Sequence, residues 1–196
     1  MIADIEGNLY KIVTIGTQVW MAENLRTTKY NDNTSIPLVA DNTVWGNLIT
    51  PGYCWYNNDE ATNKPLYGAL YNWNTVNTGK LCPAGWHVPT DDQWTTLTTY
   101  LGGENIAGGK LKEIGNIHWT NGNVGATNET GFTALPGGDR DYNGLFTRIG
   151  ITGIWQSSTP YVGKAMYLIM YGNQAAVSHS SSAKVNGYSV RCLKDN

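Results

Sequence analysis

Three histidines and three cysteines are the residues of this chain best suited to nucleophilic or general-base chemistry. A catalytic nucleophile needs an adjacent base and a third group that orients the base. Cys82 and His87 are close in sequence, but Cys82 directly precedes a proline, which favours a structural role. His118 precedes a tryptophan, as packed or surface histidines do, and His179 lies in a serine-rich segment that we expect to be solvated. The sequence therefore predicts a protein that is not an enzyme.

Metal and cofactor sites are equally weak in the sequence. The histidines and cysteines have no zinc-ligand spacing, and the paired glycines match no phosphate-binding motif. Asn57, Asn58 and Asp59, and also Asp139 and Asp141, could offer oxygen ligands to calcium. Clustered Asn and Asp residues, however, mostly cap turns. The sequence predicts no cofactor and no catalytic or zinc-type metal centre, and it leaves a structural calcium ion open.

The composition excludes several classes of protein. The chain has 196 residues, with 8 Trp and 12 Tyr but only 2 Phe, and these polar-tipped aromatics suit wet cores and binding faces alike. Only 14% of residues are charged and the net charge is −2, which offers no basic surface for nucleic acid or anionic membranes. No run approaches the roughly 18 apolar residues of a membrane span, and no secretory signal is recognisable. An odd number of cysteines leaves at least one unpaired, so the compartment is undecided.

The elements that would hold these residues read as mixed α+β. Residues 4–22 resemble a β-meander with turns at Gly7-Asn8 and Gly16-Thr17, and residues 23–66 read as long ordered loops anchored by aromatic residues. Apolar spacing predicts a short helix near 67–76 and a helical turn over 109–114. Residues 167–171 and 188–193 are the most strand-like segments that follow. No internal repeat or linker is evident, so we expect one domain over 1–196.

The clearest local pattern is a capped helix over about 91–101. Thr90 fits the N-cap and Gln93 the third helical position, which together make a capping box. Asp91 and Asp92 lie in the first turn, where the helix dipole favours negative charge. Trp94, Leu97 and Leu101 share one face, and a pair of glycines at 102–103 ends the helix.

The last quarter of the chain alternates fixed-looking residues with apparently free choices. The fixed-looking positions are Gly144, Phe146, Gly150, Gly153, Trp155, Ser157, Ser158, Thr159, Gly187, Ser189, Arg191 and Cys192. The residues between them, such as Arg148, Ile151, Ile154 and Gln156, follow neither a helical nor a strand period. Such a chain can hold a rigid frame while it presents a variable face, which favours binding over catalysis.

Several motifs together resemble the Fibrobacter succinogenes major paralogous domain. They are Asp4 to Asn8, Trp20 to Leu25, Tyr53 to Asp59, Leu70 to Trp73, Leu81 to Thr90, Gly131 to Gly138 and Ser189 to Cys192. The resemblance runs in order from about residue 4 to residue 195. It implies a bacterial surface or secreted protein, so we expect an extracellular, cell-surface or virion location, with the cytoplasm not excluded.

The C-terminal half also resembles C-type lectin-like folds, including the variable proteins of diversity-generating retroelements. The resemblance rests on Trp155-Gln156-Ser157-Ser158 and on the closing segment Gly187 to Cys192. It implies a tether between the main helix region and the last strand, which a Cys82–Cys192 disulfide would supply; in a reducing compartment the two cysteines would instead stay free and buried. The family usually carries a second Trp at the position of Gln156, and this departure suggests a solvent-facing side chain there.

Three binding functions follow. The first is a diversified receptor that contacts a protein or carbohydrate ligand on a cell surface. The second is a fixed-specificity carbohydrate or adhesion module, which exposure of Trp45, Tyr53 or Trp55 would favour. The third is an assembly subunit of a phage or cell surface. The candidate ligand-binding residues are Asp139, Asp141, Tyr142, Asn143, Arg148, Ile151, Thr152, Ile154, Gln156, Tyr161, Tyr167, Tyr171, Asn173 and Gln174.

Overall fold

A computed structural model describes residues 1–195 and confirms a mixed α+β architecture. The sheet with the most strands pairs β3 (Ile12–Ile15), β4 (Gln18–Met21), β13 (Leu193–Lys194) and β7 (Trp86–His87) in that order. A second sheet is the meander β10 (Thr152–Tyr161), β11 (Lys164–Tyr171) and β12 (Val177–Ala183). Three two-stranded ribbons pair β1 (Ile2–Ala3) with β2 (Leu9–Tyr10), β5 (Tyr53–Cys54) with β6 (Leu70–Tyr71), and β8 (Asp139–Arg140) with β9 (Phe146–Thr147).

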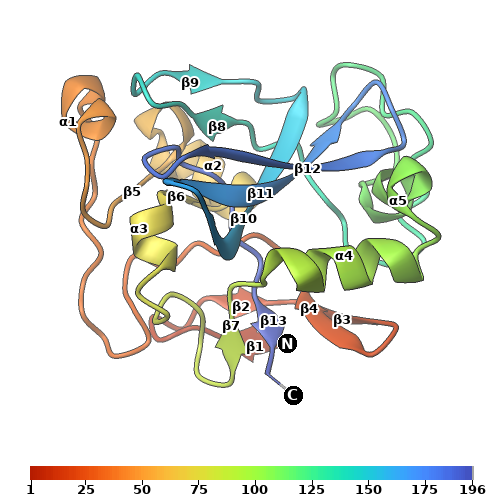
Figure 1. The fold of residues 1–196 in the computed structure, drawn as a ribbon, viewed down its shortest axis with the longest axis horizontal. Coiled ribbons are helices and arrows are strands. Elements are labelled where there is room, and N and C mark those ends of the chain that lie inside the picture. Colours follow the sequence, from red (N-terminus) through yellow and green to blue (C-terminus); the bar gives the residue numbers. More distant parts are fainter. Residues whose placement is uncertain (196) are drawn as a thin grey trace.

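Six short helical segments connect and cover these sheets. They are α1 (Asn42–Gly46), the 3₁₀ turn η1 (Tyr56–Asn58), α2 (Glu60–Tyr67), α3 (Trp73–Val76), α4 (Asp91–Tyr100) and α5 (Glu104–Leu111). Figure 1 shows the β10–β11–β12 sheet across the middle of the molecule, with β8 and β9 above it and α4 below it. The sheet that holds β3, β4, β13 and β7 lies at the bottom with both ends of the chain. None of the helices within residues 1–195 has the length and apolar character that crossing a bilayer requires.

The capped helix matches the sequence-based expectation, and the N-terminal meander matches it in part, because β1–β2 and β3–β4 belong to separate sheets. β2, β3 and β4 fall within the predicted meander, although its first strand is Ile2–Ala3 and not the segment around Ile5. Thr90 accepts a hydrogen bond from the Gln93 N–H while the Gln93 side chain accepts one from the Thr90 N–H, so the capping box of α4 is confirmed. α4 ends where Gly102 turns into the left-handed region, with a φ of 99°.

Three predicted elements differ from the structure. Residues 67–76 are not one helix: Tyr67 ends α2, Gly68 has a φ of 72°, residues 70–71 form β6 and Asn72 caps the separate helix α3. The helical turn expected over 109–114 is the end of α5, which begins at Glu104. Position 108, inside α5, has room only for glycine, because a Cβ there would stand 2.7 Å from the carbonyl oxygen of Ala176. Of residues 188–192 only Tyr188 and Ser189 form single bridges, to Tyr71 and Trp155, and the strand β13 begins at Leu193.

Aromatic residues dominate a core that lies between the two larger sheets. The rings of Trp20 and Trp94 have their centroids 4.5 Å apart. The ring of Phe132 meets those of Trp20, Trp94 and Trp155 edge to face at 6.0–6.3 Å. Such edge contacts add to the free energy of burial. The fixed-looking Trp155 is therefore part of the frame that holds β10.

A buried polar network joins the N-terminal region to the C-terminal segment. The Oδ1 atom of Asn24 accepts hydrogen bonds from Trp155 Nε1 and from Arg191 Nε, both at 2.9 Å. The amide nitrogen of Asn24 donates to the carbonyl of Tyr67 and to Ser189 Oγ. We call Asn24, Trp155, Ser189 and Arg191 the Asn24 network. Its side chains are at most 5% exposed, so each hydrogen bond replaces one to water.

Candidate functional site

The two faces of the β10–β11–β12 sheet have different surroundings. Opposite residues in antiparallel strands share a face, so the pairs Gln156–Tyr167 and Tyr167–Ser180 place these three side chains together. The pairs of Leu168 with Trp155 and His179 define the other face. Leu168 and Trp155 belong to the core cluster that also contains residues of α4. Only the first face can therefore meet a ligand.

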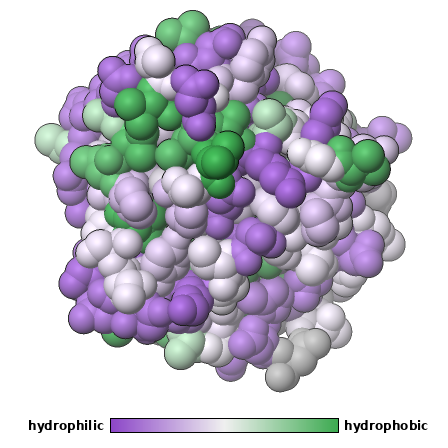
Figure 2. All heavy atoms as spheres, turned by 60° about the vertical axis from the view of Figure 1, so that its left-hand side comes forward, coloured by the Kyte–Doolittle hydropathy of each residue, from purple (hydrophilic) through white to green (hydrophobic). Residues whose placement is uncertain are grey.

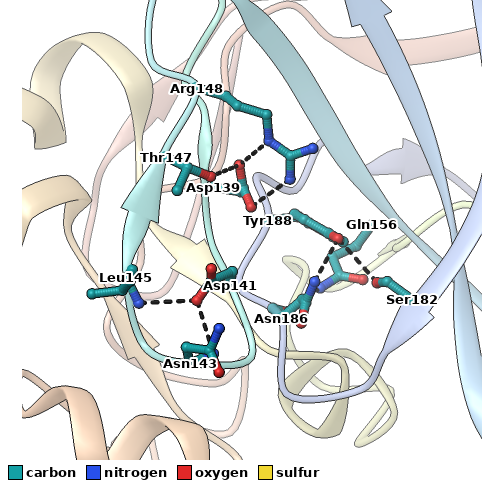
Figure 3. Close-up of polar contacts among 10 residues, drawn as sticks. All are labelled: Asp139, Asp141, Asn143, Leu145, Thr147, Arg148, Gln156, Ser182, Asn186 and Tyr188. Carbon is teal, nitrogen blue, oxygen red and sulfur yellow. Dashed lines mark hydrogen bonds and ion pairs between the residues drawn. The ribbon is translucent and has the colours of Figure 1, made fainter.

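Tyr188 covers the middle of this first face. It packs with Ile154 and Ile169, and its ring centroid lies 5.0 Å from that of Tyr167. Its hydroxyl donates to Ser182 Oγ at 3.0 Å and accepts from Asn186 Nδ2 at 2.9 Å (Figure 3). Because the side chain is almost fully buried, desolvation raises the pKa of Tyr188 to about 12.

Arg148 borders the same face and is tied to a buried carboxylate. Its Nε and Nη2 atoms donate to the two oxygens of Asp139 at 2.7 and 2.6 Å, and Thr147 donates to the same carboxylate (Figure 3). Asp139 is fully buried, whereas the Arg148 side chain is 40% exposed. This bidentate pair raises the pKa of Arg148, whose guanidinium also interacts electrostatically with the phenols of Tyr167 and Tyr188.

The backbone at Arg148 has an unusual conformation. Its φ of 65° lies in the left-handed region, which non-glycine residues seldom adopt. Its carbonyl accepts hydrogen bonds from the N–H groups of Ile151 and Thr152 at 3.0 Å, which closes the turn into β10. Strained residues of this kind persist where the surrounding contacts hold them, and here the Asp139 carboxylate does so.

The turn between β8 and β9 adds a second exposed segment. One oxygen of Asp141 accepts hydrogen bonds from the N–H groups of Asn143 and Leu145, at 2.8 and 3.0 Å, which shapes the turn (Figure 3). Tyr142, in this turn, is 59% exposed, and Asn143 is exposed as well. The fully buried Arg140 donates to the carbonyls of Val39 and Ala40, so the ribbon is fixed against the loop before α1.

The structure separates the predicted site residues into exposed and buried groups. Tyr167 and Tyr171 are half-buried on the open face, together with Ser178 and the exposed Ser180 of the edge strand β12. We call Arg148, Tyr167, Tyr171, Ser178 and Ser180 the contact face. The remaining exposed or half-buried candidates lie at the end of β10 or in turns and loops around the sheet: Asp141, Tyr142, Asn143, Ile151, Tyr161, Asn173 and Gln174.

Four predicted contact residues are buried. Gln156 is 1% exposed and donates to the carbonyls of Tyr71 and Asn186, so the expectation of a solvent-facing side chain was wrong. Thr152 and Ile154 are also buried, and Ile154 packs against Tyr188. Asp139 is fully buried and pairs with Arg148.

The cysteines and His179, which were considered for catalysis and metal binding, are buried or have structural partners. Cys82 is joined to Cys192 by a disulfide, while the third cysteine, Cys54, is buried and has its pKa raised to about 12 by desolvation. His179 was expected to be solvated, but it is half-buried and bonds Asp91 at 2.6 Å. Within residues 1–195 no group of three His, Cys, Asp or Glu side chains could hold a metal ion.

The oxygen atoms considered for calcium have structural partners. Asp59 accepts a hydrogen bond from the N–H of Thr62 and caps α2. Asn57 and Asn58 adopt left-handed turns, with φ values of 53° and 56°. The Asp139 and Asp141 carboxylates are used by Arg148 and by the β8–β9 turn. These clusters therefore serve as caps, turns and an ion pair.

The aromatic anchors of residues 23–66 are internal. Trp45, Tyr53 and Trp55 are 0%, 6% and 2% exposed. Burial removes the feature that would have favoured sugar stacking on these rings. It agrees with the expectation of an ordered region, although this segment also contains α1, β5, η1 and most of α2.

Sequence reasoning missed part of the exposed surface. Recognising Val177 to Ala183 as a strand would have placed Ser178 and Ser180 on one face of it. An apolar surface near α1 was also missed: Val44, Ile49 and Leu145 are 54%, 88% and 52% exposed. Figure 2 turns this side of the molecule forward and shows apolar atoms gathered on its upper part. No periodic pattern marks these three residues.

Together the fold and the site define a mixed α+β domain whose buried polar and aromatic frame carries a shallow polar–aromatic face. The family comparison agrees with the motifs that build this frame. Residues 13–194 match the model of the Fibrobacter succinogenes major domain, and the chain belongs to that family. Neither the curated proteins nor the solved structures contain a significant match to this chain.

Proposed function

We propose that this protein is a non-enzymatic ligand-binding protein that presents the contact face to a protein or carbohydrate on a cell surface. The observation that carries the proposal is the division of one sheet between two tasks. Trp155 and Leu168 anchor it to the core, while Tyr167, Tyr171 and Ser180 on its opposite face stay accessible.

The chemistry of the contact face suits varied ligands. Tyr167 and Tyr171 offer large, stiff surfaces with a polar tip, and Ser178 and Ser180 offer adaptable hydroxyl groups. Arg148 adds a cation that Asp139 neutralises and holds in place. Tyrosine and serine have the same uses in antibody loops.

The proposal includes diversification of the diversity-generating retroelement type on a C-type lectin-like scaffold. The C-terminal motif resemblance and the separation of frame from face support it. The Cys82–Cys192 bridge lies where that resemblance implies a tether, and a disulfide persists in an oxidising compartment such as the cell surface. Variation would fall on accessible side chains and spare the buried neighbours on the same strands.

A paired library selection tests the binding capacity of the face. One display library randomises Tyr167, Tyr171, Ser178 and Ser180, and a second randomises the buried residues Thr152, Ile154 and Gln156. We expect folded, disulfide-bonded binders to a chosen test protein, such as lysozyme, from the first library only. Loss of folding in the first library, or equal recovery of binders from both, would contradict the proposal.

An assembly subunit is the second candidate, and the apolar surface in Figure 2 favours it. Next to Ile49 a hollow of about 500 Å³ is lined by Leu48, Gly163 and Val185, among others. Exposed apolar patches of this kind mark protein interfaces. Sedimentation of the wild type and of Ile49→Ser separates the two functions. A concentration-dependent oligomer that Ile49→Ser dissolves would support assembly, and a monomer in both would support ligand display.

A further inference from the structure

A small polar hollow lies away from the contact face, beside the Asn24 network. Its volume is about 210 Å³, and its walls come from residues 22–26, from the end of α2 and from the loop 131–135. Three cationic side chains and one carboxylate line it: Lys11, Arg26, Arg191 and Glu23. The chain as a whole has a net charge of −2, so this is a local excess of positive charge.

Arg191 is the unusual member of this set. It is 1% exposed, yet every hydrogen-bond acceptor that it has among residues 1–195 is neutral. Nε donates to Asn24 Oδ1, Nη1 to the carbonyl of Phe132, and Nη2 to the carbonyl of Thr133 at 2.9 Å. A guanidinium has five N–H groups, and Arg191 donates three hydrogen bonds, so two of its N–H groups have no acceptor among residues 1–195.

The environment leaves the Arg191 charge poorly compensated. Desolvation lowers the pKa of Arg191 to about 9, and the Glu23 carboxylate opposes this shift only in part. A buried charge that lacks an opposite charge is costly, and a bound anion would supply Arg191 with one. The rings of Phe132 and Trp155, with centroids 4.1 and 5.7 Å from the guanidinium carbon, fix its position.

The loop that lines the hollow is held in a strained conformation. Thr133 has a φ of 54°, which is rare for a β-branched residue. Its N–H donates to Asn128 Oδ1, and its carbonyl is thereby turned toward Arg191. The guanidinium is thus oriented before any ligand arrives.

The rim extends the positive surface toward a neighbouring hollow. Arg26 is fixed over the ring of Tyr10 at 4.6 Å and donates to the carbonyl of Leu9. Arg26 and Pro65 also line a larger hollow of about 560 Å³. The two hollows lie side by side, because they share Arg26 and Pro65. Lys64 lines the larger hollow and pairs there with Glu60 at 2.8 Å, so cationic side chains predominate along both hollows.

We propose that the smaller hollow binds an oxyanion, a carboxylate or a phosphate group, with Arg191 at its floor and Lys11 and Arg26 at its rim. Guanidinium groups recognise both kinds of oxyanion through paired, charge-assisted hydrogen bonds. This site is separate from the contact face, and it goes beyond the proposed function. Failure of either proposal leaves the other intact.

Nuclear magnetic resonance titration tests the site directly. Sodium acetate and sodium phosphate are titrated separately into the uniformly ¹⁵N-labelled protein at constant ionic strength, with sodium chloride as the balancing salt. We expect saturable shifts of the Arg191 Nε–H, the Thr133 N–H and the Asn24 side-chain amide. Saturation by acetate alone assigns a carboxylate site, and saturation by phosphate assigns a phosphate site.

Charge variants at the rim separate binding from a merely structural role of Arg191. Lys11→Gln should weaken binding by about threefold, while Glu23→Gln should strengthen it by about threefold, as expected for one partly exposed charge each. Lys164→Gln, an exposed change in the β10–β11 hairpin, serves as the matched control and should leave the affinity unchanged. Non-saturating shifts, shifts that chloride reproduces, or equal affinities in all three variants would overturn the proposal.

Discussion

The Asn24 network and the contact face use the same kinds of polar group in opposite ways. Asn24, Ser189 and Arg191 direct their polar atoms at one another and at buried carbonyls, and each of them is at most 5% exposed. Tyr167 and Ser180 lie on the open face of β11 and β12, where polar groups remain available. The network specifies the fold, because an unpaired group there is expensive, whereas Tyr167 and Ser180 can change at little cost.

The largest expected effect comes from opening the disulfide that closes the frame. Cys82 and Cys192 are 110 residues apart, and a bridge across so long a loop stabilises a protein by about 4 to 5 kcal/mol in the chain-entropy model. The double variant Cys82→Ala/Cys192→Ala should lose about that much free energy of unfolding, measured in urea. A loss below about 1 kcal/mol would show that the frame does not depend on this bridge.

Asn24→Ala should be the next most damaging change. It leaves the buried N–H groups of Trp155 and Arg191 without their shared acceptor, which should lower the free energy of unfolding by about 3 kcal/mol. Asn143→Ala, at an exposed turn, is the matched control and should stay within about 0.5 kcal/mol of the wild type. Similar losses in both variants would erase the distinction between the network and the surface turns.

Arg148 tests the border between frame and face. Arg148→Ala leaves the Asp139 carboxylate buried without its cation, and we expect a loss of about 2 kcal/mol, reduced by the partial exposure of Arg148. Arg148→Ala/Asp139→Asn should recover most of this loss, because the buried charge is gone. A double variant that is no more stable than Arg148→Ala would mean that Arg148 acts through other contacts.

Of these four changes, replacing Tyr188 should have the smallest effect on the free energy of unfolding, and this effect should depend on pH. The fold raises its pKa to about 12, so between about pH 10 and pH 12 the folded state keeps a proton that the unfolded chain releases. Stability should therefore fall as pH rises through this interval. Tyr188→Phe should cost about 1 kcal/mol at neutral pH, from two lost hydrogen bonds, and should show a shallower fall at high pH. Parallel pH profiles for the two proteins would contradict this assignment.

The sequence predicted what depends on local signals. The capping box of α4 needs only Thr90, Gln93 and the backbone between them, and it was found. The spacing of Tyr67, Leu70 and Trp73 imitates one helix, but three different elements contain these residues because Gly68 breaks the chain direction.

The candidate site was predictable only in outline. The sequence predicted residues 167–171 as a strand, and the register of β10 and β11 places Tyr167 and Tyr171 on one of its faces. It could not show which end of that face is covered, because the cover comes from Asn186 and Tyr188, far along the chain. Gln156 is buried for this reason.

Population sequencing of the gene tests the central claim most directly. If the contact face is a diversified binding surface, substitutions should gather at Tyr167, Tyr171 and the exposed turn residues. Ile154 and Gln156 on the same sheet, and the Asn24 network, should remain constant, and changes at Arg148 should accompany changes at Asp139. Substitutions spread evenly over buried and exposed positions, or an invariant face, would contradict diversification and leave a fixed-ligand or assembly protein.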